Sequence, residues 1–252
     1  MSHTTKKGSS FLVRPRQEPA ALRLFCFPYA GGGASIYRAL AQAVPGQIEV
    51  VPVQPPGREN RLNEPAQRLI GDLLDLLEGE ILPLLDRPYA FFGYSLGATV
   101  AFELALRLDQ RHQLPPRHVV VAARQAPHLA TRRPPIHALP DPEFLDALRD
   151  LEGTPVEALD HPELMQLLMP LLRADFEIVE TYEARQRPAL SCTLTAFGGL
   201  KDRDVMREDL EGWRGYGQEP FKIRMFPGGH FFINENRDQL LAALLQELLP
   251  KI

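Results

Sequence analysis

The sequence predicts an α/β protein whose mostly parallel central sheet is flanked by helices and interrupted by a helical insertion. Over residues 21–123, short apolar runs that suit strands alternate with stretches of helical periodicity. The strand-like runs are apolar throughout, which is typical of parallel strands buried on both faces. From residue 128 to residue 187 the alternation stops, and strand-like runs then return. We therefore expect helices inserted between two parts of one sheet.

Each expected element follows from its pattern. A strand is expected where an apolar run ends at a proline, as at Pro28, and a helix where leucine or valine recurs every three or four residues. The expected strands are residues 22–27, 48–53, 89–94, 119–123, 192–197 and 222–226. The expected helices are residues 35–44, 65–85, 96–108 and 236–249, with two more in the insertion that begin near Asp141 and His161, the second interrupted by Pro170.

Length and composition are those of an ordinary globular protein. The 252 residues are 44% hydrophobic and 24% charged, which suits a single domain, expected over residues 21–252 after a flexible tail at residues 1–20. A net charge of −4 gives no reason to expect nucleic acid or a membrane as partner. The N-terminus lacks a secretory h-region, and Cys26 and Cys192 lie in apolar runs. We therefore expect two buried thiols and a cytoplasmic protein.

Residues 93–97 read Gly-Tyr-Ser-Leu-Gly and match the motif G-x-S-x-G. They lie between a strand-like run and a helical stretch, which is the context of a nucleophile elbow in the α/β-hydrolase fold. In that turn the serine has strained backbone angles, and side chains two residues to either side would collide with the backbone. We therefore predict Ser95 as the nucleophile of a serine hydrolase; the alternative is a plain strand–helix turn.

A serine hydroxyl is a weak nucleophile until a base takes its proton, and His230 is the expected base. Of the seven histidines, only His230 follows a late strand-like run, which places it at the carboxyl end of the sheet, where such sites form. An acid should follow the strand at residues 192–197, because this fold uses the chain order Ser, Asp, His. Asp202 fits this position better, and Asp204 stays open as the alternative. The acid would hold the imidazole in the productive tautomer.

Attack on a carbonyl leaves a negative oxygen that needs donors, and two backbone N–H groups are expected to supply them. One belongs to Leu96, directly after the nucleophile, and the other to Ala30, in the glycine-rich loop at residues 27–33. A phosphate-binding loop is the alternative there, but this loop has neither the G-x-G-x-x-G pattern nor a Walker lysine. We expect no metal and no other cofactor, and neither cysteine has the spacing of a metal site.

Four motifs in combination resemble the type II thioesterases, the free-standing editing enzymes of polyketide and nonribosomal peptide assembly lines. They are residues 27–32 (Phe-Pro-Tyr-Ala-Gly-Gly), 56–58 (Pro-Gly-Arg), 93–97 and 229–232 (Gly-His-Phe-Phe), and the resemblance extends from residue 22 to the C-terminus. It implies the same five site residues, namely Ser95, Asp202, His230, Ala30 and Leu96. It also implies that the insertion, residues 128–187, is a lid. The substrate would be a thioester on the phosphopantetheine arm of an acyl or peptidyl carrier protein, and the enzyme a monomer.

The chain departs from the family's pattern at three places. It has Tyr94 where a histidine often precedes the nucleophile, and Arg203 where a proline often follows the acid. Residues 122–125 read Ala-Ala-Arg-Gln where a Ser-Gly-Arg-like run is often found. None of these changes removes one of the three expected catalytic side chains.

Two other functions remain open from the sequence. Because the fold and its three side chains serve many acyl substrates, the chain could be a small-molecule carboxylesterase or an acyltransferase. A non-catalytic binding protein on a hydrolase scaffold is the other alternative, although such proteins usually lose one of the three side chains. The acyl group and the pathway depend on the shape of the pocket, which the sequence does not specify.

Overall fold

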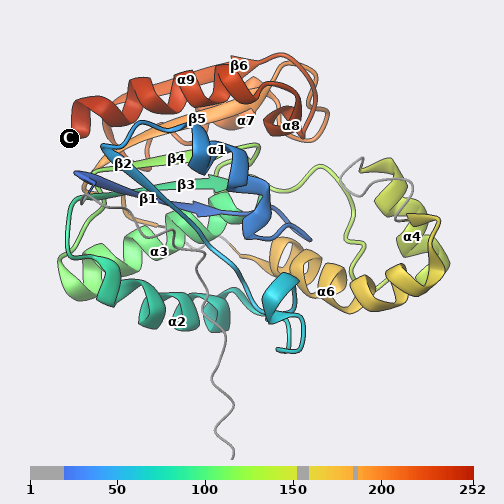
Figure 1. The fold of residues 1–252 in the computed structure, drawn as a ribbon. Helices are drawn as coiled ribbons and strands as arrows, with labels where there is room; N and C mark the ends of the chain where they lie inside the picture. The colour runs from blue at the N-terminus through green and yellow to red at the C-terminus, as the bar shows by residue number, and fades with distance from the viewer. Residues whose placement is uncertain (1–19, 152–158, 184–186) are drawn as a thin grey trace, which may run out of the picture.

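The core of the protein is a six-stranded sheet in which every strand runs parallel to its neighbours, in the order β2-β1-β3-β4-β5-β6 (Figure 1). The structure is a computed structural model that describes residues 20–151, 159–183 and 187–252. The strands are β1 (Leu22–Phe27), β2 (Ile48–Pro52), β3 (Tyr89–Tyr94), β4 (His118–Ala122), β5 (Thr193–Gly199) and β6 (Gln218–Phe226). The predicted α/β fold class is confirmed, and all six expected strands are present.

Helices cover both faces of this sheet (Figure 1). On one face, α2 (Ile70–Ile81) and α3 (Leu96–His112) enclose an apolar layer that includes Leu77 and Leu104. On the other face, α1 (Arg38–Ala43) and α9 (Arg237–Leu248) enclose a layer that includes Tyr37 and Leu244. The shorter helices are η1 (Ala34–Tyr37), η2 (Glu59–Arg61), η3 (Leu82–Leu84), α7 (Arg207–Glu211), α8 (Phe232–Glu235) and η4 (Leu249–Lys251).

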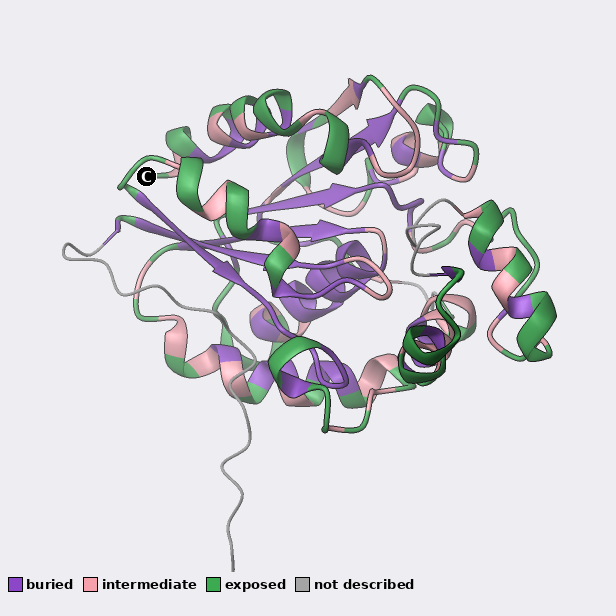
Figure 2. Cartoon of the chain, turned by 45° about the vertical axis from the view of Figure 1, so that its right-hand side comes forward, coloured by how far each residue is buried: buried purple, intermediate pink, exposed green. Residues whose placement is uncertain are grey.

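Burial along the strands explains why they lack the alternation of a half-exposed sheet. Every residue of β1, β2, β3 and β4 is buried, because both faces of the sheet are covered by helices. Figure 2 shows the buried strands directed towards the insertion. The loops that follow the strands therefore meet the insertion at one edge of the sheet.

The insertion between β4 and β5 consists, in its described part, of helices and loops without a strand. Its helices are α4 (Asp141–Asp150) and α6 (Pro162–Thr181). Side chains of both helices, including Phe144 and Met165, form an apolar cluster of their own, separate from the two layers of the sheet. Figure 1 shows α4 standing apart from those layers.

The expected interruption at Pro170 is wrong, because α6 continues through this residue. A proline removes one helical hydrogen bond and crowds the preceding turn. Buried side chains of α6 on both sides of it, including Met165 and Ile178, hold the helix against its neighbours. Tertiary packing thus outweighs the local cost of the proline.

Three further expectations concern the ends of the chain and its thiols. The predicted flexible tail at residues 1–20 lies outside the described residues except for Ala20, which is buried and so belongs to the folded part. Cys26 and Cys192 are both buried and unpaired, as expected. Among the described helices, none has the length and apolar character needed to cross a membrane.

Candidate active site

Ser95 occupies the sharp turn between β3 and α3. Its backbone has φ of +52° and ψ of −114°, a conformation that is strained for any residue other than glycine. A Cβ atom at Gly93 would lie 2.2 Å from the Gly97 carbonyl oxygen, and one at Gly97 would lie 2.1 Å from the Phe27 carbonyl oxygen. Only glycine fits either position, and the turn therefore has the geometry that the motif predicts for a nucleophile elbow.

His230 reaches Ser95 from the loop after β6. Its Nε2 atom lies 3.1 Å from Ser95 Oγ, and its Nδ1 atom lies 2.8 Å from Asp202 Oδ2. With the proton on Nδ1 and donated to the carboxylate, Nε2 is left as an acceptor facing the serine hydroxyl. The three side chains thus form one hydrogen-bonded chain, in the arrangement that the motifs predict.

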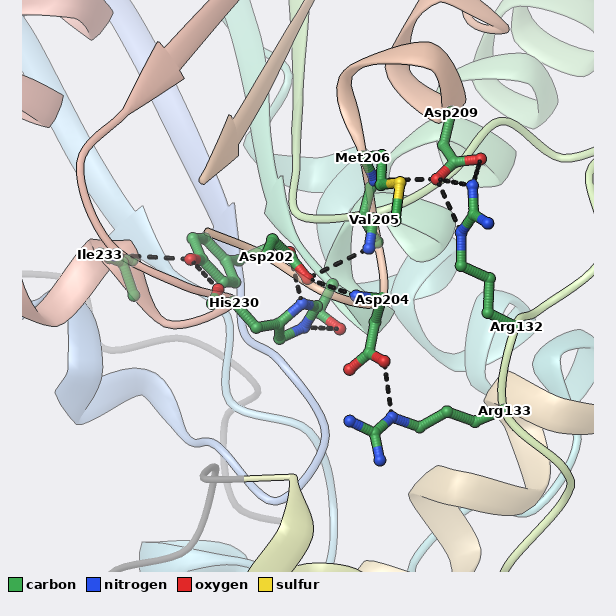
Figure 3. Close-up of polar contacts among 11 residues, drawn as sticks. Arg132, Arg133, Asp202, Asp204, Val205, Met206, Asp209, His230 and Ile233 are labelled. Atoms are coloured by element: carbon green, nitrogen blue, oxygen red, sulfur yellow. Dashed lines mark hydrogen bonds and ion pairs between the residues drawn. The ribbon is translucent and has the colours of Figure 1, made fainter. Parts of the chain in front are cut away.

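The two candidate aspartates have different partners (Figure 3). The other oxygen of Asp202, Oδ1, accepts from the backbone N–H groups of Asp204 and Val205 at 2.9 Å and 3.1 Å. The Asp204 carboxylate instead accepts from Arg133 Nε at 2.6 Å. Of the two acids, only Asp202 is hydrogen-bonded to His230 in the described part of the chain, and the geometry favours it for the third position.

The environment of Asp202 keeps its carboxyl group ionised. Burial of this side chain acts to raise its pKa, but the hydrogen bond and charge of His230 and the two backbone N–H groups outweigh burial and lower the pKa below its ordinary value. A carboxylate is therefore present at neutral pH, opposite Nδ1 of the imidazole. This is the state needed to stabilise an imidazolium formed during proton transfer.

The two expected oxyanion donors come from different elements. Leu96 opens α3, and Ala30 lies in the loop after β1. Neither backbone N–H has an acceptor among the described residues, whereas the N–H of Ser95 donates to the Ala122 carbonyl at 2.8 Å. Within the described residues, both N–H groups thus remain available as donors, and their role in binding an oxyanion stays a prediction.

A largely apolar cavity of about 340 Å³ opens at Ser95 and His230. One wall comes from loops at the sheet edge and the other from the insertion. The insertion residues that line it include Ile136, Ala147, Leu148, Leu172, Phe176 and Val179. A volume of this size accommodates a small organic group directly beside the serine.

Two buried residues next to this site form an ion pair that the sequence did not predict. Arg58 belongs to the Pro-Gly-Arg motif but had no assigned role, and Asp175 of α6 was not singled out. They form a buried ion pair with N–O distances of 2.8 Å at both nitrogens. The signal was present in α6, where Asp175 is an acid between apolar residues such as Leu171 and Ile178 at helical spacing.

Asp202, Asp204 and His230 also place ligand atoms within 4.8 Å of one another, and carboxylates and imidazole are common metal ligands. Each of the three already has protein partners, however. His230 uses both ring nitrogens, Asp202 uses both oxygens, and Asp204 is paired with Arg133. The arrangement is that of a proton-transfer chain.

Comparison with known proteins agrees with the geometry. The parallel sheet and nucleophile elbow define an α/β-hydrolase fold, which the solved structures of similar proteins share. A type II thioesterase, BorB from the borrelidin biosynthetic cluster, superposes with a TM-score of 0.87 at 33% identity, covering 97% of this chain and 100% of that one. RedJ, a thioesterase of the prodiginine pathway in Streptomyces coelicolor, gives 0.83 at 38% identity, covering 93% and 91%.

The chain belongs to the thioesterase family. The family model, described as a thioesterase domain, matches residues 22–248. GrsT of gramicidin S biosynthesis in Aneurinibacillus migulanus is 40% identical over 92% of this chain and 93% of its own length. The predicted membership of the type II group, the hydrolytic thioesterases associated with polyketide and nonribosomal peptide synthesis, is confirmed.

Proposed function

We propose that this thioesterase removes acyl groups from the phosphopantetheine thioester of acyl or peptidyl carrier proteins, and so clears stalled or aberrant units from an assembly line. The observation that carries the proposal is the hydrogen-bonded chain of Ser95, His230 and Asp202 at the opening of an apolar cavity. The names of two relatives, which refer to gramicidin S biosynthesis and to a type II thioesterase of the borrelidin biosynthetic cluster, support it.

In the proposed mechanism, Ser95 Oγ attacks the thioester carbonyl while His230 Nε2 takes its proton. The negative oxygen that forms is bound by the N–H groups of Ala30 and Leu96. The imidazolium then gives its proton to the departing phosphopantetheine thiol, which leaves the acyl group on Ser95. A water molecule, deprotonated in turn by His230, releases the acid and restores the serine.

Asp202 has two tasks in this scheme. Its carboxylate accepts from His230 Nδ1 and thereby keeps Nε2 available as the base, and it stabilises the positive charge that the ring acquires. The backbone N–H groups that hold its other oxygen prevent the side chain from turning away. The acid is thus fixed before the substrate binds.

The insertion forms the part of the cavity that would receive the acyl group. Its apolar residues face the space beside Ser95, so an aliphatic acyl chain would be transferred from water to an apolar surface. We propose that the insertion acts as a lid and that the carrier protein docks beside it as the protein partner of a monomeric enzyme. The phosphopantetheine arm then carries the thioester to Ser95.

Hydrolysis rates on three donors of the same acyl group test this proposal. Acetyl or butyryl on a holo carrier protein should be cleaved with a kcat/KM at least about tenfold above that of the matching coenzyme A thioester, because docking adds binding energy away from the carbonyl. A p-nitrophenyl ester of the same acid serves as the small-molecule control. Equal kcat/KM values on all three donors would favour the carboxylesterase, and transfer of the acyl group to an alcohol or amine in place of water would favour the acyltransferase.

Hydrogen exchange on the free protein tests the lid. The amides of α4 should exchange faster than those of β3, because α4 packs on a small separate cluster while β3 is buried in the centre of the sheet. An α4 as protected as β3 would contradict an opening lid without affecting the proposed chemistry.

A further inference from the structure

The insertion makes a hydrogen bond to the loop that carries Ala30, which is called the oxyanion loop from here on. The loop between β1 and η1 carries Ala30, and its next residue, Gly31, donates its N–H to Asp175 Oδ2 at 2.7 Å. Asp175 belongs to α6, 144 residues further along the chain. A side chain of the insertion therefore holds a backbone group directly beside the proposed oxyanion donor.

Arg58 completes this contact from the other side. Its two terminal nitrogens, Nη1 and Nη2, bind the two carboxylate oxygens of Asp175 at 2.8 Å each, and Nη1 also donates to the Gly32 carbonyl at 3.0 Å. Both side chains are almost fully buried, at 5% exposure for Arg58 and 2% for Asp175. A charge-assisted, bidentate pair of this kind has a defined geometry and holds its neighbours in place.

A hydrogen bond within the loop connects Gly32, which Arg58 holds, to the peptide unit that carries the Ala30 N–H. The Gly32 N–H donates to the Tyr29 carbonyl at 2.9 Å, and this carbonyl and the Ala30 N–H belong to one planar peptide unit. Holding Gly32 by its carbonyl and Gly31 by its N–H therefore sets the direction of the Ala30 donor. Neither Arg58 nor Asp175 lines the cavity at Ser95, so both act through the loop.

Gly31 also fits the insertion sterically. Its φ is +77°, and a Cβ atom there would lie 2.6 Å from Leu172 Cδ2. Leu172 lies on α6 three residues before Asp175, and it lines the cavity beside Ser95. The same turn of α6 thus bounds the acyl cavity with one side chain and fixes the oxyanion loop with another.

We propose that Asp175 and Arg58 are positioning residues that couple the seating of the insertion to the formation of the oxyanion hole. When α6 is seated, Asp175 and Arg58 orient the Ala30 N–H towards the developing oxyanion; when α6 moves away, the loop loses this support. The inference rests on the proposed serine mechanism, but not on the nature of the acyl donor. Full hydrolytic activity therefore requires that α6 is packed against the loop that carries Ala30.

The test is Asp175→Asn, which keeps the size of the side chain and removes its charge, together with Arg58→Lys, which keeps the charge and removes the bidentate geometry. Each should lower kcat about 10- to 100-fold with little change in KM, since loss of a whole oxyanion donor costs about 10²- to 10³-fold. The rates are taken per active site, counted by the end point of fluorophosphonate labelling. The double variant should lose little more than either single variant, because the pair acts as a unit.

Glu49→Gln is the matched control. Glu49 and Arg23 also form a buried ion pair, with an N–O distance of 2.8 Å, on the first strands of the sheet and outside the site. This control should lower thermal stability and leave kcat per active site unchanged. A purely structural role for Asp175 would give the same result, and such an outcome for Asp175→Asn would overturn the proposal.

Exchange of the Gly31 amide in the unchanged protein gives a second test that does not depend on the variants folding. If the coupling holds, this amide exchanges no faster than the amides of α6 around Ile178 and is released with them. A Gly31 amide that exchanges far ahead of α6 would overturn the proposal. The kinetic test can be run with a p-nitrophenyl ester, and the exchange test needs no substrate, so a failure of the coupling is distinguishable from an error in the carrier-protein substrate.

Discussion

The two walls of the candidate active site are built in different ways. The sheet wall carries Ser95, Asp202 and His230 directly after β3, β5 and β6, and β3 and β5 are almost entirely buried. The insertion wall is made of α4 and α6, which share a separate apolar cluster, and Ile178 of α6 also packs into the apolar layer beneath α2 and α3. Figure 2 shows the contrast, with buried strands on one side and a largely exposed α4 on the other.

Polar contacts along α6 join the insertion wall to the sheet side, in addition to the ion pairs of Arg132 with Asp209 and of Arg133 with Asp204. Asp175 is paired with Arg58, and Glu177 is paired with Arg68 at 2.5 Å. Near the end of the helix, Arg124 Nη2 donates to the Val179 carbonyl at 3.3 Å. When α6 is seated, these contacts hold its C-terminal half at the sheet edge, and α4 packs against α6 in the separate apolar cluster.

The sheet wall is therefore suited to the chemical steps, and the apolar lining of the insertion wall is suited to selecting the acyl group. A hydrogen-bonded chain needs atomic distances that only a rigid scaffold maintains, and the sheet wall supplies them. An acyl group is bound by apolar contact, which tolerates change in the surrounding side chains. Substitutions in the sheet wall should therefore lower the rate on every substrate, and substitutions of the apolar insertion residues that line the cavity should change which substrates are accepted.

The largest effect is expected for Ser95→Ala. Removing the hydroxyl abolishes the covalent step, and turnover should fall by about 10⁶-fold on all acyl donors. A fluorophosphonate should label the parent protein and fail to label the variant. Ser191→Ala is the control, because this exposed serine binds Asp109 outside the site. Near-parent activity in Ser95→Ala would show that another residue is the nucleophile.

The next effect compares the two aspartates. Asp202→Asn should lower kcat by about 10⁴-fold, because an amide facing Nδ1 favours the wrong imidazole tautomer. Asp204→Asn should stay within about threefold, since it loses an exposed ion pair with Arg133, a type of contact worth little. Measuring kcat for both variants at one pH is sufficient. The reverse order would assign the acid to Asp204.

A smaller and selective effect is expected in the insertion. Ala147 of α4 lines the cavity, and Ala147→Phe should shorten the space available to the acyl chain. The kcat/KM for octanoyl substrates should fall about tenfold or more, while acetyl substrates change little. Asp146→Phe adds the same ring at an exposed position of the same helix and serves as control. An equal loss on both chain lengths would show that α4 does not select the acyl group.

The sheet wall was also the part that could be predicted from the sequence. Apolar runs and helical periodicity located every strand, and the motif around Ser95 and the position of His230 identified residues that the structure brings together. These signals are local, because strained turns and buried parallel strands demand particular residues at particular spacings. The choice between Asp202 and Asp204 depends on the three-dimensional structure, since both residues follow the same strand.

The insertion wall was harder to predict for a physical reason. Its helices were expected, but the continuation of α6 through Pro170 depends on packing that no local pattern expresses. The pairing of Arg58 with Asp175 joins residues 117 positions apart. Long-range polar contacts of this kind are fixed by the arrangement of elements, so a single sequence does not reveal them.

The smallest effect is expected at Tyr94, the residue that departs from the family's pattern before the nucleophile. Its substitution tests how far the Tyr94 hydroxyl fixes the position of His230. The Tyr94 hydroxyl donates to the His230 carbonyl at 2.5 Å and accepts from the Ile233 N–H at 3.4 Å. Burial raises the pKa of Tyr94, so the hydroxyl stays protonated and remains a donor. Tyr94→Phe should lower the free energy of unfolding by about 1–3 kcal/mol, because a buried acceptor loses its partner.

Tyr89→Phe is the matched control for this variant, at the opposite end of the same strand. The Tyr89 hydroxyl donates to the Leu114 carbonyl, so its loss should destabilise the fold by a similar amount. Only Tyr94→Phe should also lower kcat, by about two- to tenfold, because the loop that carries His230 then has more freedom and the distance from Nε2 to Ser95 Oγ is less well maintained. Denaturant titration and steady-state kinetics on both variants separate the two effects. If both variants lose stability and neither loses activity, the backbone of His230 is held by the rest of its loop and Tyr94 contributes to stability alone.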